Sequence, residues 1–171
     1  FSRLSGCLLL QNLAHAEGGG AYRCTMNDSV VSNNAVLSDF SGIGGGVSLG
    51  TLTNCLLVGN TVLAEPGNGG GASGGRLVNC TVCGNHASHE GGGAFLSELQ
   101  NSIVHGNVSE IGERNDVYGG TASYSCTHPD SDGIGNITND PQLTPTFRLR
   151  STSPCIDAGT TNGAPATDSD G

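Results

Sequence analysis

The sequence of 171 residues contains no tryptophan, no lysine and one methionine, and aromatic residues make up only 4% of it. Leu, Ile, Val and Phe together account for about a fifth of the chain, so the core must be thin and a compact helical bundle is disfavoured. The longest apolar run, Cys7 to Leu10, is far too short to cross a bilayer, and we expect no transmembrane segment. Six basic residues face fifteen acidic ones, and the net charge of -9 opposes phosphate backbones, so we expect no nucleic-acid partner.

Glycine is abundant, with 29 residues, and much of it belongs to an internal repeat. A nine-residue string recurs five times: LSGCLLLQN at 4–12, MNDSVVSNN at 26–34, LTNCLLVGN at 52–60, LVNCTVCGN at 77–85 and LQNSIVHGN at 99–107. The asparagines that end these strings recur every 22–26 residues; they are Asn12, Asn34, Asn60, Asn85 and Asn107. Glycine triplets keep step with them at 18–20, 44–46, 69–71 and 91–93, and we expect Gly119 and Gly120 to be a shortened triplet.

A unit of this length is too short for two helices, and its glycines and short β-branched stretches favour short strands. One such unit cannot bury its apolar face alone, whereas units stacked at about 4.8 Å share a continuous core. We therefore predict an all-β fold, a right-handed parallel β-helix with about 22–26 residues per coil. The coils are expected over residues 1–126, and an irregular tail over 127–171 is expected to pack on the last coils of this single domain.

Alternation within the repeat assigns side chains to faces. Three columns are expected to point inward: the first begins with Leu4 and Met26, the second with Cys7 and Ser29, and the third with Leu9 and Val31. Between the first two, residue types that tolerate a left-handed backbone indicate a tight turn; they are Gly6, Asp28, Asn54, Asn79 and Asn101. An outward apolar stripe remains, which the tail or another chain is expected to cover; it consists of Leu8, Val30, Leu56, Thr81 and Ile103.

The repeats resemble those of bacterial extracellular β-helix proteins, including passenger regions of polymorphic outer-membrane proteins, through GGGA and NC-x-V-x-GN strings. The tail resembles the end of the helix in secreted proteins of the choice-of-anchor, pectin-lyase-like class. The strings that carry this second resemblance are YSC at 124–126, GIGNITNDPQL at 133–143, RLRSTSPCIDAG at 148–159 and TDSDG at 167–171. The resemblance implies a secreted or cell-surface bacterial protein. Because the chain begins in mid-coil, we expect it to be part of a longer β-helix.

Seven cysteines leave at least one thiol without an intrachain partner. Cys126 and Cys155 both belong to the strings that carry the resemblance, which favours a disulfide that locks the tail onto the last coil. Such a bond would close a loop of about 30 residues. Cys7, Cys55 and Cys80 are expected to be small buried apolar residues.

The asparagine column is the most regular polar feature of the sequence, and we interpret it as a structural ladder of stacked amides. A glycosidase needs two carboxylates on neighbouring or alternate rungs. Glu17 and Glu90 share a position before the glycine triplet but are expected three rungs apart, which leaves Glu90 as a weak catalytic candidate. In a lyase without lysine the base would be Arg76 or Arg23, although Arg76 and Glu98 are expected to form an exposed ion pair.

Two groups of residues are candidates for metal binding, although no cofactor is required. Imidazole and thiol ligands for a transition metal come from Cys83, His86, His89 and His105, which could equally be solvated side chains. Oxygen ligands for calcium come from a loop with Asp130, Asp132 and Asn136, which could equally be turn formers. Asp168 and Asp170 form a similar string at the end of the chain.

These observations favour a non-catalytic, secreted or cell-surface β-helix module that serves as a stalk, an adhesin or a carbohydrate-contacting surface. The first alternative is a polysaccharide lyase or glycoside hydrolase of the pectin-lyase-like superfold, since this superfold carries both kinds of protein. The second is a self-assembling structural protein, because open coil ends and the apolar stripe invite association. A polysaccharide or cell-surface glycan is a possible partner, although the lack of tryptophan offers little support for it.

Overall fold

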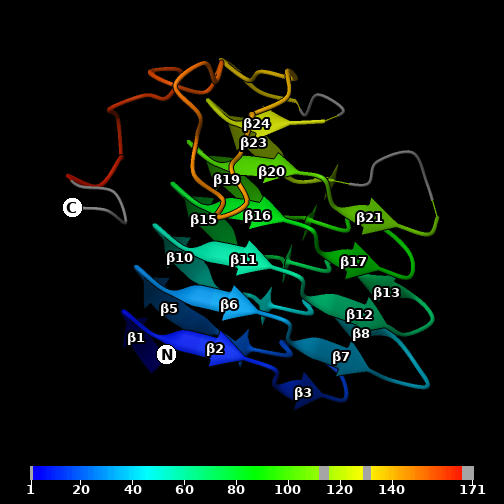
Figure 1. The fold of residues 1–171 in the computed structure, drawn as a ribbon. Coiled ribbons are helices and arrows are strands. Elements are labelled where there is room, and N and C mark those ends of the chain that lie inside the picture. The colour runs from blue at the N-terminus through cyan, green and yellow to red at the C-terminus, as the bar shows by residue number, and fades with distance from the viewer. Residues whose placement is uncertain (1, 112–115, 129–131, 167–171) are drawn as a thin grey trace.

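The computed structural model describes residues 2–111, 116–128 and 132–166, and these residues contain no helix. Short parallel strands stack into a β-solenoid of about five turns (Figure 1), which confirms the predicted all-β parallel β-helix. No described segment forms a helix that is long and apolar enough to span a membrane.

Two six-stranded parallel sheets run the length of the solenoid. The first contains β1 (Ser2–Ser5), β5 (Cys24–Asn27), β10 (Thr51–Thr53), β15 (Arg76–Val78), β19 (Glu98–Gln100) and β23 (Thr121–Ser123). The second contains β2 (Leu8–Leu10), β6 (Val30–Ser32), β11 (Leu56–Val58), β16 (Thr81–Cys83), β20 (Ile103–His105) and β24 (Cys126–Thr127).

Three smaller parallel sheets complete the solenoid. The third sheet contains β3 (Leu13–Ala14), β7 (Ala35–Leu37), β12 (Thr61–Leu63), β17 (His86–Ala87) and β21 (Val108–Ser109). The fourth pairs β8 (Gly42–Ile43) with β13 (Gly67–Asn68). The fifth contains β4 (Ala21–Tyr22), β9 (Val47–Ser48), β14 (Ala72–Ser73), β18 (Ala94–Phe95) and β22 (Val117–Tyr118).

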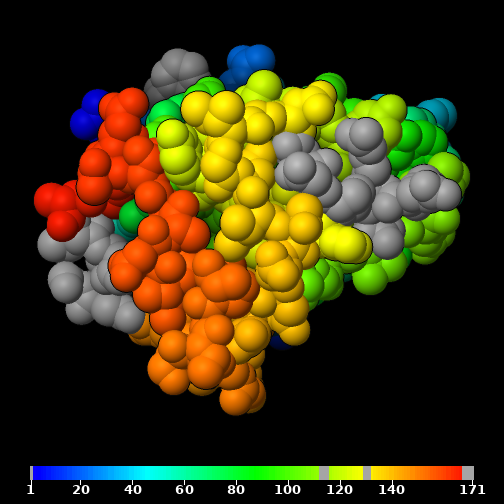
Figure 2. Space-filling model, turned by 90° about the horizontal axis from the view of Figure 1, so that it is seen from above, coloured from blue at the N-terminus to red at the C-terminus, as the bar shows by residue number. Residues whose placement is uncertain are grey.

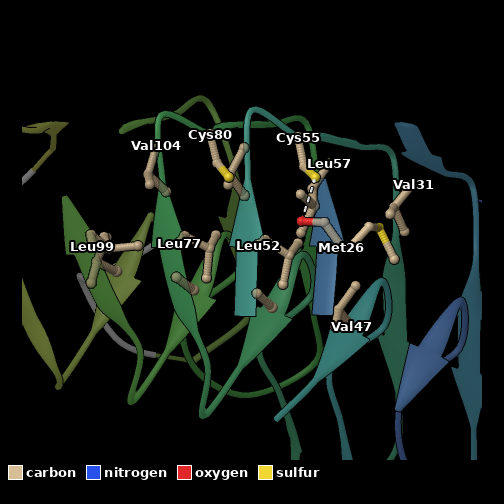
Figure 3. Packing of buried hydrophobic residues seen from close by; sticks show 14 of the residues in the cluster. Met26, Val31, Val47, Leu52, Cys55, Leu57, Leu77, Cys80, Leu99 and Val104 are labelled. Atoms are coloured by element: carbon tan, nitrogen blue, oxygen red, sulfur yellow. Dashed lines mark hydrogen bonds between the residues drawn. The ribbon is translucent and has the colours of Figure 1, made fainter. Parts of the chain in front are cut away.

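The core consists of columns of stacked apolar side chains (Figure 3). In the first sheet Leu52 pairs with Met26 on one side and Leu77 on the other, and all three are fully buried. In the second sheet Leu57 lies between Val31 and Val82, which are also fully buried. The predicted inward faces and register of these sheets are therefore confirmed.

The turn between the first two sheets has a left-handed backbone on every coil, as the residue types indicated. The positive φ angles lie between 48° and 61° for Gly6, Asp28, Asn54, Asn79, Asn101 and Tyr124. A side chain raises the conformational energy there, and asparagine and aspartate tolerate this better than most residues. The chain can therefore leave one sheet and enter the next within a few residues.

Steric crowding explains why the third residue of each triplet is glycine. A Cβ atom on Gly71 would lie 2.6 Å from the carbonyl oxygen of Gly93 and 3.1 Å from the amide nitrogen of Asn85. The coils and the asparagine column approach too closely there for any side chain. The expectation for Gly119 and Gly120 was wrong, because Tyr118 pairs with Phe95, which places these glycines on the row that follows the fifth sheet.

The tail begins as an incomplete further rung and then folds back over the solenoid. The backbone of Ala122 donates to the carbonyl of Asp132, Tyr124 donates to Ile134, and Thr127 donates to Ile137. Figure 2 shows the yellow and orange segments covering this end of the molecule. In Figure 1 the orange part of the tail descends beside β20 and β16, whereas β1, β2 and β3 have a neighbouring strand on one side only.

Candidate functional site

The asparagine column forms a continuous hydrogen-bonded ladder in the core wall. The Oδ1 of Asn60 accepts hydrogen bonds from both N and Nδ2 of Asn34, at 3.0 and 2.9 Å. In the same way, Oδ1 of Asn85 accepts hydrogen bonds from N and Nδ2 of Asn60, both at 2.9 Å. The Nδ2 of Asn60 also donates to the backbone carbonyl of Val31. The amides of the ladder all point along the stack in one direction, and the buried backbone of the turn is satisfied from rung to rung.

Asp116 ends this ladder, and sequence reasoning missed it. Its Oδ1 accepts hydrogen bonds from N and Nδ2 of Asn107, both at 2.8 Å, and the residue is 4% exposed. Burial raises the pKa of the Asp116 carboxyl, while the two hydrogen bonds from Asn107 oppose that rise. A signal was available: Asp116 precedes Val117 and Tyr118 as Gly93 precedes Ala94 and Phe95, so it replaces the third glycine of a triplet.

A second hydrogen-bonded column occupies the position after the left-handed turn, and the tail closes it. The hydroxyl of Ser102 accepts a hydrogen bond from the backbone N of Cys80 at 3.2 Å. The hydroxyl of Ser125 likewise accepts one from the backbone N of Ser102 at 3.1 Å. On the next rung Oδ1 of Asn136 accepts from the backbone N of Ser125 at 3.1 Å. Asn136 therefore extends a structural column into the tail.

The calcium candidates are only partly described. Asp130 lies outside the described residues, as do Asp168 and Asp170. Asp132 is exposed and accepts a hydrogen bond through its backbone carbonyl, and Nδ2 of Asn136 donates to the carbonyl of Ala122 at 3.0 Å. The Asn136 amide therefore has structural partners in this geometry.

The four candidates for a transition metal are not brought together as a metal-binding group. Each histidine of the set faces its own carboxylate: His86 faces Glu110 at 3.3 Å, His89 faces Glu90 at 3.8 Å, and His105 faces Asp140 at 4.0 Å. Cys83 is buried, and burial raises the pKa of its thiol to about 12, far from the thiolate that a metal needs. Within the described part of the chain, no three His, Cys, Asp or Glu side chains are grouped to hold an ion.

The weak catalytic candidates lie in separate places and have partners. The Nε of Arg76 is 3.0 Å from Oε1 of Glu98, and its Nη2 donates to Oε1 of Gln100 at 2.7 Å. Glu90 lies in the column that runs from Glu17 through Ile43 and Asn68, and its backbone N donates to Oδ1 of Asn68 at 3.1 Å. Ile43 and Asn68 occupy the two intermediate rungs of this column, so Glu17 and Glu90 are three rungs, or about 14 Å, apart.

A cavity of about 670 Å³ lies between the tail and the second sheet. Its wall on the coil side includes Thr81 and Ile103 of the apolar stripe, and its wall on the tail side includes Phe147, Arg148 and Asp157. The tail thus lies over the upper part of the stripe, while Leu8 at its lower end is 65% exposed. The sequence led us to expect the tail or another chain over this stripe, but the individual contacts between the tail and the coils could not be inferred from the repeat.

Asn101 anchors the tail at this cavity. Its Nδ2 donates to the carbonyl of Thr160 at 2.7 Å, and its Oδ1 accepts from the backbone N of Thr160 at 2.9 Å. Gln100 beside it donates to the carbonyl of Asn162. One side-chain amide therefore binds both polar groups of one tail residue, as a neighbouring strand would.

Cys126 and Cys155 meet at the edge of the same cavity. The two thiols are hydrogen-bonded to each other. Both thiols are free, as are the other five. The tail therefore brings together the two cysteines for which the resemblance favoured a disulfide.

Comparison with models of protein families, with curated proteins and with solved structures finds no match for this chain.

Proposed function

We propose that this chain is a non-catalytic structural module, a stalk-like segment of a secreted or cell-surface bacterial β-helix protein. The observation that carries the proposal is the Asn ladder, which runs from Asn12 to Asn107 and ends on Asp116. Its amides are hydrogen-bonded to one another and to the backbone, so the most regular polar feature of the molecule serves its stability. The secreted, bacterial setting rests on the motif resemblance.

The alternative of polysaccharide cleavage has weaker support. Hydrolysis with two carboxylates requires a separation of about 5–5.5 Å or about 6.5–9.5 Å, and the column that holds Glu17 and Glu90 does not meet either value. Elimination requires a free base, and Arg76 is hydrogen-bonded to both Glu98 and Gln100.

The test is a panel of acidic and neutral polysaccharides, each followed by ultraviolet absorbance for unsaturated products and by new reducing ends, with calcium and with chelator. The proposal predicts no cleavage in either condition. Turnover that Glu90→Gln or Arg76→Gln abolishes would contradict it and point to an enzyme. Turnover that chelator alone abolishes would point to a calcium-dependent lyase and to the loop with Asp132.

Contact with a glycan is a second candidate function, supported by two exposed tyrosines on the fifth sheet. Tyr22 is 45% exposed and Tyr118 is 36% exposed. The guanidinium of Arg23 lies over the Tyr22 ring at 5.1 Å, and the Tyr118 ring stacks on Phe95 at 5.6 Å, so each ring already has a partner within the chain. Retardation in gels that contain one polymer of the panel, lost in Tyr118→Ala, would support glycan contact.

Self-association is a third candidate, supported by the unpaired edges of β1, β2 and β3 and by the exposed part of the apolar stripe. Sedimentation of the chain over a range of concentrations tests it. A monomer at every concentration would contradict self-association and leave the stalk proposal unchanged.

A further inference from the structure

Two thiols that are 29 positions apart in sequence meet where the tail crosses the last coil. Cys126 belongs to β24 and is 4% exposed, whereas Cys155 belongs to the tail and is half-buried. The Sγ of Cys126 donates a hydrogen bond to the carbonyl of Asn139 at 3.3 Å. The backbone N of Cys155 donates to the hydroxyl of Ser153 at 3.1 Å, and that hydroxyl donates to the carbonyl of Pro141. Both cysteines are therefore held in place by neighbouring polar groups.

The two thiols differ in reactivity. The hydrogen bond between the two thiols lowers the pKa of Cys155 to about 7, so a large share of Cys155 is thiolate at neutral pH. The same hydrogen bond, with burial, raises the pKa of Cys126. Burial also raises the pKa values of Cys24, Cys80 and Cys83. Only one thiol of the pair is thus both partly accessible and nucleophilic.

Another pair of thiols provides an internal comparison. Cys55 and Cys80 are also hydrogen-bonded to each other, but they lie inside the solenoid and are 3% and 1% exposed. Figure 3 shows both sulfur atoms in the core between Val104 and Met26. A reagent in solution cannot reach this pair without opening the coils.

We propose that Cys126 and Cys155 form a redox latch: a small disulfide oxidant of the glutathione class converts them to a disulfide that fastens the tail over the cavity. The proposal goes beyond the structural role and does not depend on it. In the reduced chain no covalent bond fastens the tail there, and its hydrogen bonds to the coils include those of Asn101 and Gln100.

The reaction balances in two steps of thiol exchange. The Cys155 thiolate attacks one sulfur of the oxidant, forms a mixed disulfide and releases one thiolate of the oxidant. Cys126 loses its proton and attacks the Cys155 sulfur, which forms the Cys126 to Cys155 bond and releases the second thiolate. The protein loses two electrons and two protons, and the oxidant is reduced to two thiols.

The test is incubation of the full chain with oxidised glutathione at neutral pH, followed by alkylation of the remaining thiols, denaturation and digestion with trypsin. The sequence makes the result unambiguous, because the chain contains no lysine and cleavage follows arginine only. Cys126 then lies in peptide 115–148 and Cys155 in peptide 151–171, and no other cysteine lies in either. The expected result is a linked pair of these two peptides and a fall from seven to five free thiols.

Two variants and one further readout complete the test. Cys155→Ser should abolish the reaction and leave all of its remaining thiols free, whereas Cys7→Ser, which removes another half-buried thiol, should leave the linkage unchanged. In the native state the oxidised chain should be cut more slowly than the reduced chain after Arg148 and Arg150, which are exposed in the tail. Failure to form the linked peptides, or a link between peptides 24–76 and 77–114 instead, would overturn the proposal. Equal rates of native cleavage would refute the latch even if the bond forms.

Discussion

Asp116 closes the asparagine ladder from within its own coil: it is nine residues from Asn107, whereas the other ladder partners are 22–26 residues apart. One carboxylate oxygen takes the place of the amide oxygen that another asparagine would supply. The ladder accordingly ends on an acceptor without the need for a further coil, and the two donors of Asn107 are satisfied.

Replacement of Asp116 separates its charge from its role as an acceptor. Because burial raises the folded-state pKa of this carboxyl, its stabilising contribution is complete below the unfolded pKa of about 3.9. That contribution is lost as the pH rises through the higher folded-state pKa. Asp116→Asn keeps the acceptor without the charge, so its free energy of unfolding should rise relative to the parent as the pH increases from about 4 to about 7. Urea titrations at several pH values measure this difference.

Asp116→Ala is the matched control, since it removes the acceptor as well. It leaves buried donors of Asn107 without this partner and should cost about 1–3 kcal/mol at neutral pH. A difference between the Asn variant and the parent that does not change with pH would contradict the assignment of a buried, charged ladder end.

Two glycines should respond oppositely to the size of the substituent. Gly71 is required for space, because a Cβ would lie 2.7 Å from Cγ1 of Val82, and Gly71→Ala should cost about 1–3 kcal/mol. Gly84 is required for its φ of 62°, whereas a Cβ there would meet no atom within 4 Å beyond its chain neighbours. Gly84→Ala should therefore cost about 1–2 kcal/mol through the backbone alone.

Asparagine substitutions distinguish the two causes by equilibrium unfolding. Asn tolerates a left-handed backbone better than Ala does, so Gly84→Asn should be milder than Gly84→Ala. The larger side chain should make Gly71→Asn worse than Gly71→Ala. The same order at both positions would refute this explanation.

The columns of the core should be far more sensitive than the surface. Leu77 is fully buried between Leu52 and Leu99, and Leu77→Ala should lower the free energy of unfolding by about 2–5 kcal/mol. Leu8→Ala, at the exposed end of the apolar stripe, should change it by less than about 0.5 kcal/mol. Comparable losses in the two variants would mean that the stripe is covered in solution.

The fold was predictable because each coil repeats the same local chemistry. The alternation around Leu52 and Leu77 fixes the inward face, and the residue types at Asn54 and Asn79 fix the turn. The last coil departs from the repeat. Asp116 replaces a glycine of the triplet, and Gly119 and Gly120 resemble a triplet in sequence but lie in the row that follows the fifth sheet. Periodicity carries no information about such an end.

The candidate site was less predictable because it depends on contacts over long sequence separations. Asn101 meets Thr160 only after the tail has folded back. The approach of Cys126 to Cys155 was indicated by the resemblance of the tail and not by the repeat. For the histidines the sequence suggested a shared metal site that the structure does not form. His86 and His105 project from strands of neighbouring coils, yet their partners, Glu110 and Asp140, come from segments without a repeat.

The central claim is that the asparagine column is a structural support, and Asn85 tests it most directly. Asn85 is 1% exposed, and its Oδ1 is the acceptor for both N and Nδ2 of Asn60. The measurement is the free energy of unfolding of Asn85→Ala, with the exposed Asn162→Ala as control. The account predicts a loss of about 1–3 kcal/mol for Asn85→Ala and a change below about 0.5 kcal/mol for the control. An unchanged stability of Asn85→Ala would contradict it.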